Sequence, residues 1–152
     1  MKIYTDQEID KAFQWLEKHD GDIEEIFKDI DHNQPHLLTY IFSDSLSSLS
    51  KNEKELMVFG ILVLYRCTSA HNLDVITPEE IENAEAKNYD LVNEKLSYKE
   101  QIDIYFQDYP QEDLLAFVED FMESEEDEEF AVGMESKLPI FITLKTVIDV
   151  LT

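Results

Sequence analysis

The sequence contains few of the residues that build tight turns and cross-links. Only three glycines, four prolines and one cysteine occur in 152 residues. So few glycines and prolines disfavour phosphate-cradling loops and folds with many tight turns, and they favour helices. The single cysteine, Cys67, excludes an intrachain disulfide and predicts a reducing, cytoplasmic location.

Basic residues are also scarce. The chain has 12 Lys and Arg against 35 Asp and Glu, a formal net charge of −23. This charge repels nucleic-acid phosphates and anionic membranes, so we predict no nucleic-acid and no membrane partner. It suits a basic protein partner, or it serves solubility alone. Self-repulsion also predicts that the melting temperature rises with added salt.

Long hydrophobic runs are absent as well. The longest is LMVFGILVLY at 56–65, about half of the roughly 20 residues that a bilayer span needs. The N-terminal MKIYTDQEID lacks the apolar segment of a secretory signal. Overall, 43% hydrophobic and 31% charged residues are typical of a globular chain. This length predicts one domain that needs no metal or disulfide for stability.

One recurring pattern marks the helix starts that the sequence predicts. A Ser or Thr is followed three residues later by Glu, which lets each side chain satisfy a free amide of the other residue. Apolar residues at helical spacing follow each instance. The pattern occurs at Thr5, Ser50, Thr77 and Ser97, with a weaker variant at Asp22. The intervals are irregular, which argues against a repeat architecture.

We therefore predict one all-α domain over residues 1–152, a bundle of about seven to eight helices. The helix at about 51–70 is apolar on nearly all sides through its middle, which predicts a central position. Gly60 inside it predicts that another helix approaches closely there. The other expected helices cover approximately 6–19, 23–30, 35–49, 78–96, 97–109, 110–122 and 137–151.

The segment 137–151 is the ambiguous one. Its residues IFITLKTV are rich in β-branched types and are compatible with a strand. A lone strand would have no partner, however, and Ile140, Leu144 and Val147 fit one helical face. We interpret the segment as a helix.

Residues 123–129 form the most acidic stretch, with six carboxylates in seven positions. A calcium-binding EF-hand requires alternating ligands, a central glycine and a final glutamate, and this stretch lacks that order. Asp29, Asp31 and Asn33 imitate the first three ligands of such a loop, but Gln34 stands where glycine is required. We interpret 123–129 as a solvated acidic loop and predict no metal ligand and no cofactor.

Histidine and cysteine patterns suggest no active site. His19–Asp20 is the central dipeptide of helical HD-type metal hydrolases, which need a further histidine before it, and here the other three follow it. Cys67 and His71 are four apart, so they could meet on one helix. We interpret them as a small core residue and a histidine at a helix end.

The acidic bias is strongest between Lys99 and Lys137, where fourteen acids and no base occur. Such a surface would steer a basic protein toward it, helped by exposed aromatics such as Tyr98. We predict a partner-facing acidic patch made by Glu119, Asp120, Glu123, Glu125, Glu126, Asp127, Glu128 and Glu129.

These features favour a small acidic helical protein-interaction module: an adaptor, an inhibitor or an immunity-type partner of a basic protein. No Gly-x-Ser-x-Gly, P-loop or dinucleotide pattern is present, so we predict no catalytic residue. Two alternatives stay open. One is a metal-assisted enzyme whose carboxylates and histidines are dispersed over several helices. The other is a structural homo-oligomer formed through a face of an apolar helix.

Overall fold

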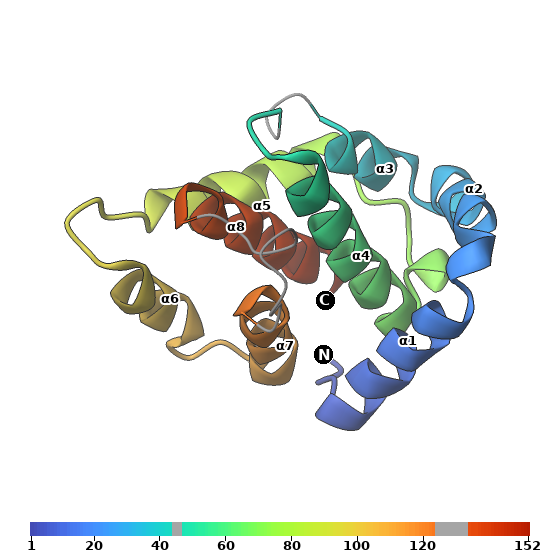
Figure 1. Ribbon diagram of the computed structural model, residues 1–152, viewed down its shortest axis with the longest axis horizontal. Coiled ribbons are helices and arrows are strands. Elements are labelled where there is room, and N and C mark those ends of the chain that lie inside the picture. The colour runs from blue at the N-terminus through green and yellow to red at the C-terminus, as the bar shows by residue number, and fades with distance from the viewer. Residues whose placement is uncertain (44–46, 124–133) are drawn as a thin grey trace.

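The structure is a computed structural model, and it describes residues 1–43, 47–123 and 134–152. Within these ranges it contains eight α-helices and no strand, which confirms the all-α bundle (Figure 1). The ambiguous segment 137–151 lies in the last helix. The helices are α1 (Asp6–Lys18), α2 (Ile23–Asn33), α3 (Pro35–Ile41), α4 (Lys51–Cys67), α5 (Pro78–Asp90), α6 (Tyr98–Phe106), α7 (Glu112–Glu123) and α8 (Met134–Leu151).

All five predicted helix starts are confirmed, and four of them have the predicted capping hydrogen bond. The hydroxyls of Thr5 and Thr77 accept hydrogen bonds from the third helical amide, and Ser50 and Ser97 form complete capping boxes. Helix α2 also begins directly after Asp22, as predicted, but the Asp22 side chain makes no capping bond. A 3₁₀ turn, η1 (Asp20–Asp22), precedes α2, so Asp22 lacks the extended backbone that a capping side chain needs.

Four helices end three or more residues earlier than predicted. One of them is α4, which stops at Cys67, shortly before Ser69 adopts a left-handed backbone with φ of 52°. α3 stops at Ile41, before a stretch rich in serine, a residue that competes with the helix for backbone hydrogen bonds. α5 stops at Asp90, and the Asn93 side chain then accepts a bond from the amide of Lys95, as in a turn. α6 stops at Phe106, shortly before Asp108 adopts a left-handed backbone with φ of 54°.

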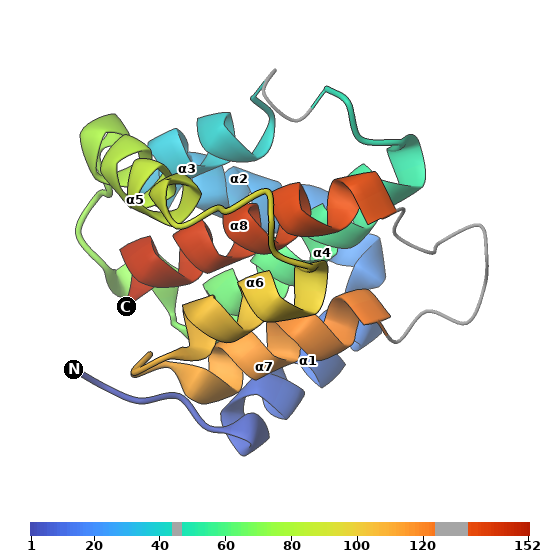
Figure 2. The same ribbon diagram turned by 90° about the vertical axis from the view of Figure 1, so that its left-hand side faces the viewer.

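Two helices form the centre of the bundle. All residues from Ile61 to Tyr65 on α4 are buried, which confirms the predicted central helix. α8 shares this position, because every residue from Ile140 to Ile148 is buried. α8 packs against α4, α5 and α7, and it runs between α5 and α7 in Figure 2. None of the described helices is both long enough and apolar enough to span a bilayer.

Gly60 marks a point where other helices approach α4 closely. A methyl group added there would lie 3.2 Å from Cε1 of Phe121 on α7 and 3.3 Å from Cδ2 of Leu144 on α8. Both distances are tighter than ordinary van der Waals contact. The predicted close approach is confirmed, and it accounts for a glycine inside the central helix.

Candidate functional site

The predicted acidic patch lies partly within the described structure. Glu119, Asp120 and Glu123 occupy the last turns of α7. Glu119 is half-buried, and the other two are exposed. The remaining patch residues lie outside the described residues, as does most of the predicted loop 123–129: Glu125, Glu126, Asp127, Glu128 and Glu129.

The described carboxylates interact with one another. The pKa of Glu119 is raised, first by burial and then by the negative charges of Asp120, Asp103 and Glu123, and Lys99 only partly opposes this shift. Asp103 belongs to α6, so like charges from two helices converge. We call Asp103, Glu119, Asp120 and Glu123 the α6–α7 acidic face. Lys137 forms an ion pair with Glu123 at 3.0 Å.

The expectation that Tyr98 is an exposed contact residue is wrong. Tyr98 is half-buried and packs against the core. Its phenol oxygen is buried and has no hydrogen-bond partner among the described residues. Its pKa is raised by burial first, and then by the charges of Glu123 and Glu119. Tyr98 therefore packs into the core, close enough to Glu119 and Glu123 for their charges to act on its phenol.

A pocket of about 430 Å³ lies between α1, α2 and α4. Its walls include the aromatic side chains of Trp15 and Tyr65 and the aliphatic side chains of Leu16, Ile26 and Leu62. Three carboxylates and one guanidinium also line it: Asp22, Glu25, Asp29 and Arg66. Sequence reasoning missed this pocket, because its residues come from three helices and form no local motif.

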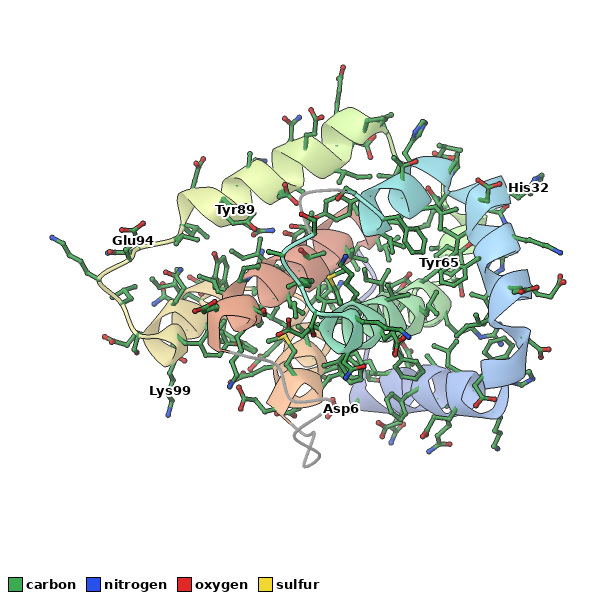
Figure 3. The ribbon with its side chains drawn as sticks, turned by 45° about the horizontal axis from the view of Figure 1, so that its top comes forward. Asp6, His32, Tyr65, Tyr89, Glu94 and Lys99 are labelled. Atoms are coloured by element: carbon green, nitrogen blue, oxygen red, sulfur yellow. The ribbon has the colours of Figure 1, made fainter. Side chains whose placement is uncertain are left out.

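Tyr65 links α4 to α2 at the wall of this α1–α2–α4 pocket (Figure 3). Its hydroxyl donates a hydrogen bond of 2.7 Å to Oδ2 of Asp29. The amide of Asn33 donates to Oδ1 of the same carboxylate at 3.1 Å. Burial and then the Asp29 charge raise the pKa of Tyr65, so the phenol stays a neutral donor. Both donors to the Asp29 carboxylate are uncharged groups, so neither forms an ion pair with it.

Trp15 carries two stacked neighbours at the other wall. The His19 ring stacks on it with centroids 4.1 Å apart and an angle of 14°. The guanidinium carbon of Arg66 lies 3.8 Å from the Trp15 centroid. Within the described part of the chain, no carboxylate lies within ion-pair distance of Arg66. Arg66 therefore packs on the Trp15 ring. It forms no ion pair with the carboxylates of Asp22, Glu25 and Asp29 in the pocket.

Cys67 and His71 do not lie on one helix, because α4 ends at Cys67. His71 lies in a 3₁₀ turn, η3 (Ala70–Asn72), and lines the α1–α2–α4 pocket, whereas Cys67 borders a different hollow beside Lys2. Burial, and next the charge of Glu8, raises the pKa of the Cys67 thiol to about 11. Such a thiol is protonated at neutral pH and is a poor nucleophile, which fits its interpretation as a structural residue.

Among the residues that the structure describes, no group of three or more His, Cys, Asp and Glu side chains is arranged to hold a metal ion. His19 instead makes a 2.7 Å hydrogen bond from Nδ1 to the carbonyl of Trp15, and it stacks on that ring. The His19–Asp20 dipeptide is thus used for local packing at the end of α1.

Sequence analysis also missed a buried polar network around Lys145 of α8. The Lys145 ammonium donates to Oδ1 of Asn88 at 2.8 Å and to Oδ2 of Asp149 at 3.0 Å. Tyr109 donates to the other Asp149 oxygen at 2.5 Å, and Tyr105 donates to the Asn88 carbonyl at 2.6 Å. Each charge has a partner, so the network joins α5, α6 and α8 as a structural cross-link.

A lysine with an aspartate four residues later, inside an apolar segment, was the available signal for this network.

Comparison with known proteins gives no match to a family model, a curated protein or a solved structure.

Proposed function

We propose that this protein is an acidic helical interaction module that binds a basic protein partner through the α6–α7 acidic face. The observation that carries the proposal is the convergence of Asp103 from α6 with Glu119, Asp120 and Glu123 of α7; after burial, these neighbouring charges raise the pKa of Glu119. Like charges within reach of one another raise the free energy of the unbound protein. A partner that brings Lys or Arg side chains to this face relieves that repulsion on binding.

The whole chain reinforces this local charge. A net charge of −23 attracts a basic protein from a distance, and the acidic face then sets its orientation. Distant charges are screened beyond roughly 8 Å at physiological ionic strength, so the nearby carboxylates dominate the final docking. The association rate should therefore fall steeply as salt is added.

The two alternative functions gain no specific support. The described residues bring together no candidate set of metal ligands for a metal-assisted enzyme. Two copies of a chain that carries −23 repel each other, which opposes a homo-oligomer.

The test compares two variants that change the net charge equally. The immobilised protein captures partners from a cytosolic extract at low salt, and binding of the recovered protein is then measured in a salt series. The face variant combines Asp103→Asn, Glu119→Gln, Asp120→Asn and Glu123→Gln. The control variant neutralises four exposed acids elsewhere: Asp10→Asn, Glu17→Gln, Asp31→Asn and Glu82→Gln.

We expect the face variant to lose about tenfold or more in association rate, while the control variant loses about twofold. Equal losses would mean that bulk charge alone is responsible, and the proposed face would then be wrong. Failure to recover any specific partner at low salt would also contradict the proposal.

A further inference from the structure

The α1–α2–α4 pocket has the size and walls of a small ligand site. Its volume of about 430 Å³ falls within the roughly 300–1,000 Å³ that such sites usually have. The half-buried side chains of Ile26 and Trp15 offer contact for an aliphatic chain, and the buried side chains of Leu16, Leu62 and Tyr65 form the apolar lining behind them. The three carboxylates come from η1 and α2, whereas Arg66 of α4 and His71 of η3 supply the other polar groups, and that arrangement would orient a bound molecule.

The wall that η1 and α2 supply is negatively charged. Asp22, Glu25 and Asp29 follow one another at intervals of three and four residues, so they share one face at the start of and along α2. Of these three carboxylates, only that of Glu25 forms an ion pair within the described part of the chain, and this is an exposed contact of 3.5 Å to Lys28. Asp29 is bonded to neutral donors, and Arg66 is not within ion-pair distance of the three carboxylates. The pocket therefore favours a cation.

The opposite wall already holds a cationic group of the chain itself. The Arg66 guanidinium lies 3.8 Å from the Trp15 centroid, as in a cation–π contact. The Arg66 guanidinium and the stacked His19 ring already occupy the Trp15 ring, so a further cation would meet the carboxylates of Asp22, Glu25 and Asp29. Arg66 is exposed, so it lies at the rim of the pocket and leaves room beside the carboxylates of α2.

We propose that the α1–α2–α4 pocket binds an alkylammonium or guanidinium group beside the carboxylates of Asp22, Glu25 and Asp29, with the aliphatic part of the ligand against the apolar lining of the pocket. The group belongs either to a Lys or Arg side chain of a protein or to a free polyamine, because both present the same charge on an aliphatic chain. The site is separate from the α6–α7 acidic face: α6 and α2 lie at opposite ends of the molecule in Figure 1. Each proposal can therefore fail without the other.

Trp15 makes the test specific, because it is the only tryptophan in the chain and it lines the pocket. Its fluorescence is titrated with Nα-acetyl-arginine methylamide, with the neutral citrulline analogue of the same shape, and with spermidine. We expect saturable changes with the two cations and no saturable change with the citrulline analogue. Tighter binding of spermidine would assign the site to a free polyamine, and tighter binding of the arginine derivative would assign it to a protein side chain.

Three variants examine the charges of the pocket. Asp22→Asn combined with Glu25→Gln should weaken cation binding about three- to tenfold, because two surface charges are lost. Glu24→Gln is the matched control, since Glu24 is exposed on the same helix and does not line the pocket. It should change binding less than about twofold. Arg66→Gln removes the competing positive charge and should strengthen binding about twofold.

The affected acids are exposed, so these variants should fold, and circular dichroism checks that they do. The proposal is overturned if neither cation gives a saturable change up to about 20 mM, well above the roughly 1 mM dissociation constant expected for so small a ligand. It is also overturned if the citrulline analogue binds as well as the arginine derivative. If Asp22→Asn combined with Glu25→Gln weakens cation binding no more than Glu24→Gln does, Asp22 and Glu25 do not take part in binding.

Discussion

The ammonium of Lys145 lies 3.0 Å from the carboxylate of Asp149, one turn further along α8, where the lysine side chain is only 9% exposed. Tyr109 and Asn88 complete the hydrogen bonding of this pair. The Lys145 nitrogen also lies 4.5 Å from the Tyr109 ring centroid. The pair therefore sits in a site that the surrounding helices build around it.

Removing the lysine should destabilise the fold strongly. In Lys145→Met the Asp149 carboxylate loses its counter-charge in a largely buried position, which typically costs about 3 kcal/mol or more. Lys51→Met is the control, because Lys51 and Glu55 form an exposed pair at 3.9 Å and its loss should cost less than about 1 kcal/mol. Urea unfolding measures both. Equal losses would show that the Lys145 network contributes no more than a surface ion pair.

The raised pKa values of Tyr105 and Tyr109 predict that the folded protein loses stability at alkaline pH. Burial and then the charge of Tyr89 raise the pKa of Tyr105 to about 12, and burial with Asp149 raises that of Tyr109 further. The folded state thus holds these protons more tightly than the unfolded chain, whose phenols titrate near 10. Stability from this source is complete below about pH 10 and is lost as pH rises through the folded values.

The measurement is the free energy of unfolding between pH 8 and pH 11, with tyrosinate absorbance followed in parallel. Cys67→Ala is the background, because the raised pKa of that thiol, about 11, would add its own loss above pH 9. Adding Tyr105→Phe should make the decline above pH 10 shallower. An unchanged decline would mean that Tyr105 does not contribute to it.

Gly60→Ala tests the crowding at the centre. The new methyl group would gain about 1 kcal/mol of helix propensity, but it would press on Phe121 and Leu144 at 3.2 and 3.3 Å. Overpacking costs about 1–3 kcal/mol, so we expect a net loss of about 1 kcal/mol. Gly21→Ala is the control, since nothing lies within 4 Å of its added methyl group. A stabilised Gly60→Ala protein would show that α7 and α8 can shift apart freely.

Salt should stabilise the protein. Screening reduces the self-repulsion of a chain with net charge −23, so the melting temperature should rise by about 5 °C between 10 mM and 500 mM sodium chloride. The four-site variant of the α6–α7 acidic face should melt higher at 10 mM salt and respond less. If the melting temperature of the natural chain does not change with sodium chloride, repulsion between its acidic side chains does not destabilise the fold.

Local sequence signals predicted the helix starts and the burial of the central helix well. A cap such as Ser50 acts on amides within its own first turn, so neighbouring residues contain all the information. Helix ends were predicted less well. α6 ends at Phe106 because the next residue, Gln107, already has an extended backbone, and glutamine is not a residue that marks a helix end.

The sites were harder to predict, because their residues meet only in the folded chain. Asn88 and Lys145 are far apart in sequence, and the α1–α2–α4 pocket joins Trp15 to Tyr65 across different helices. Composition did predict a cluster of acids before Lys137, and the described part of that cluster, around Glu119, is where like charges converge.

The position of α8 in the chain has a consequence for biosynthesis. Ribosomes deliver α8 after every helix against which it packs, so α4, α5 and α7 emerge with their apolar faces unmatched. Molecular chaperones that bind exposed apolar surface would therefore have access to the nascent chain during that interval. Cooperative closure must then wait until residues 134–151 leave the exit tunnel.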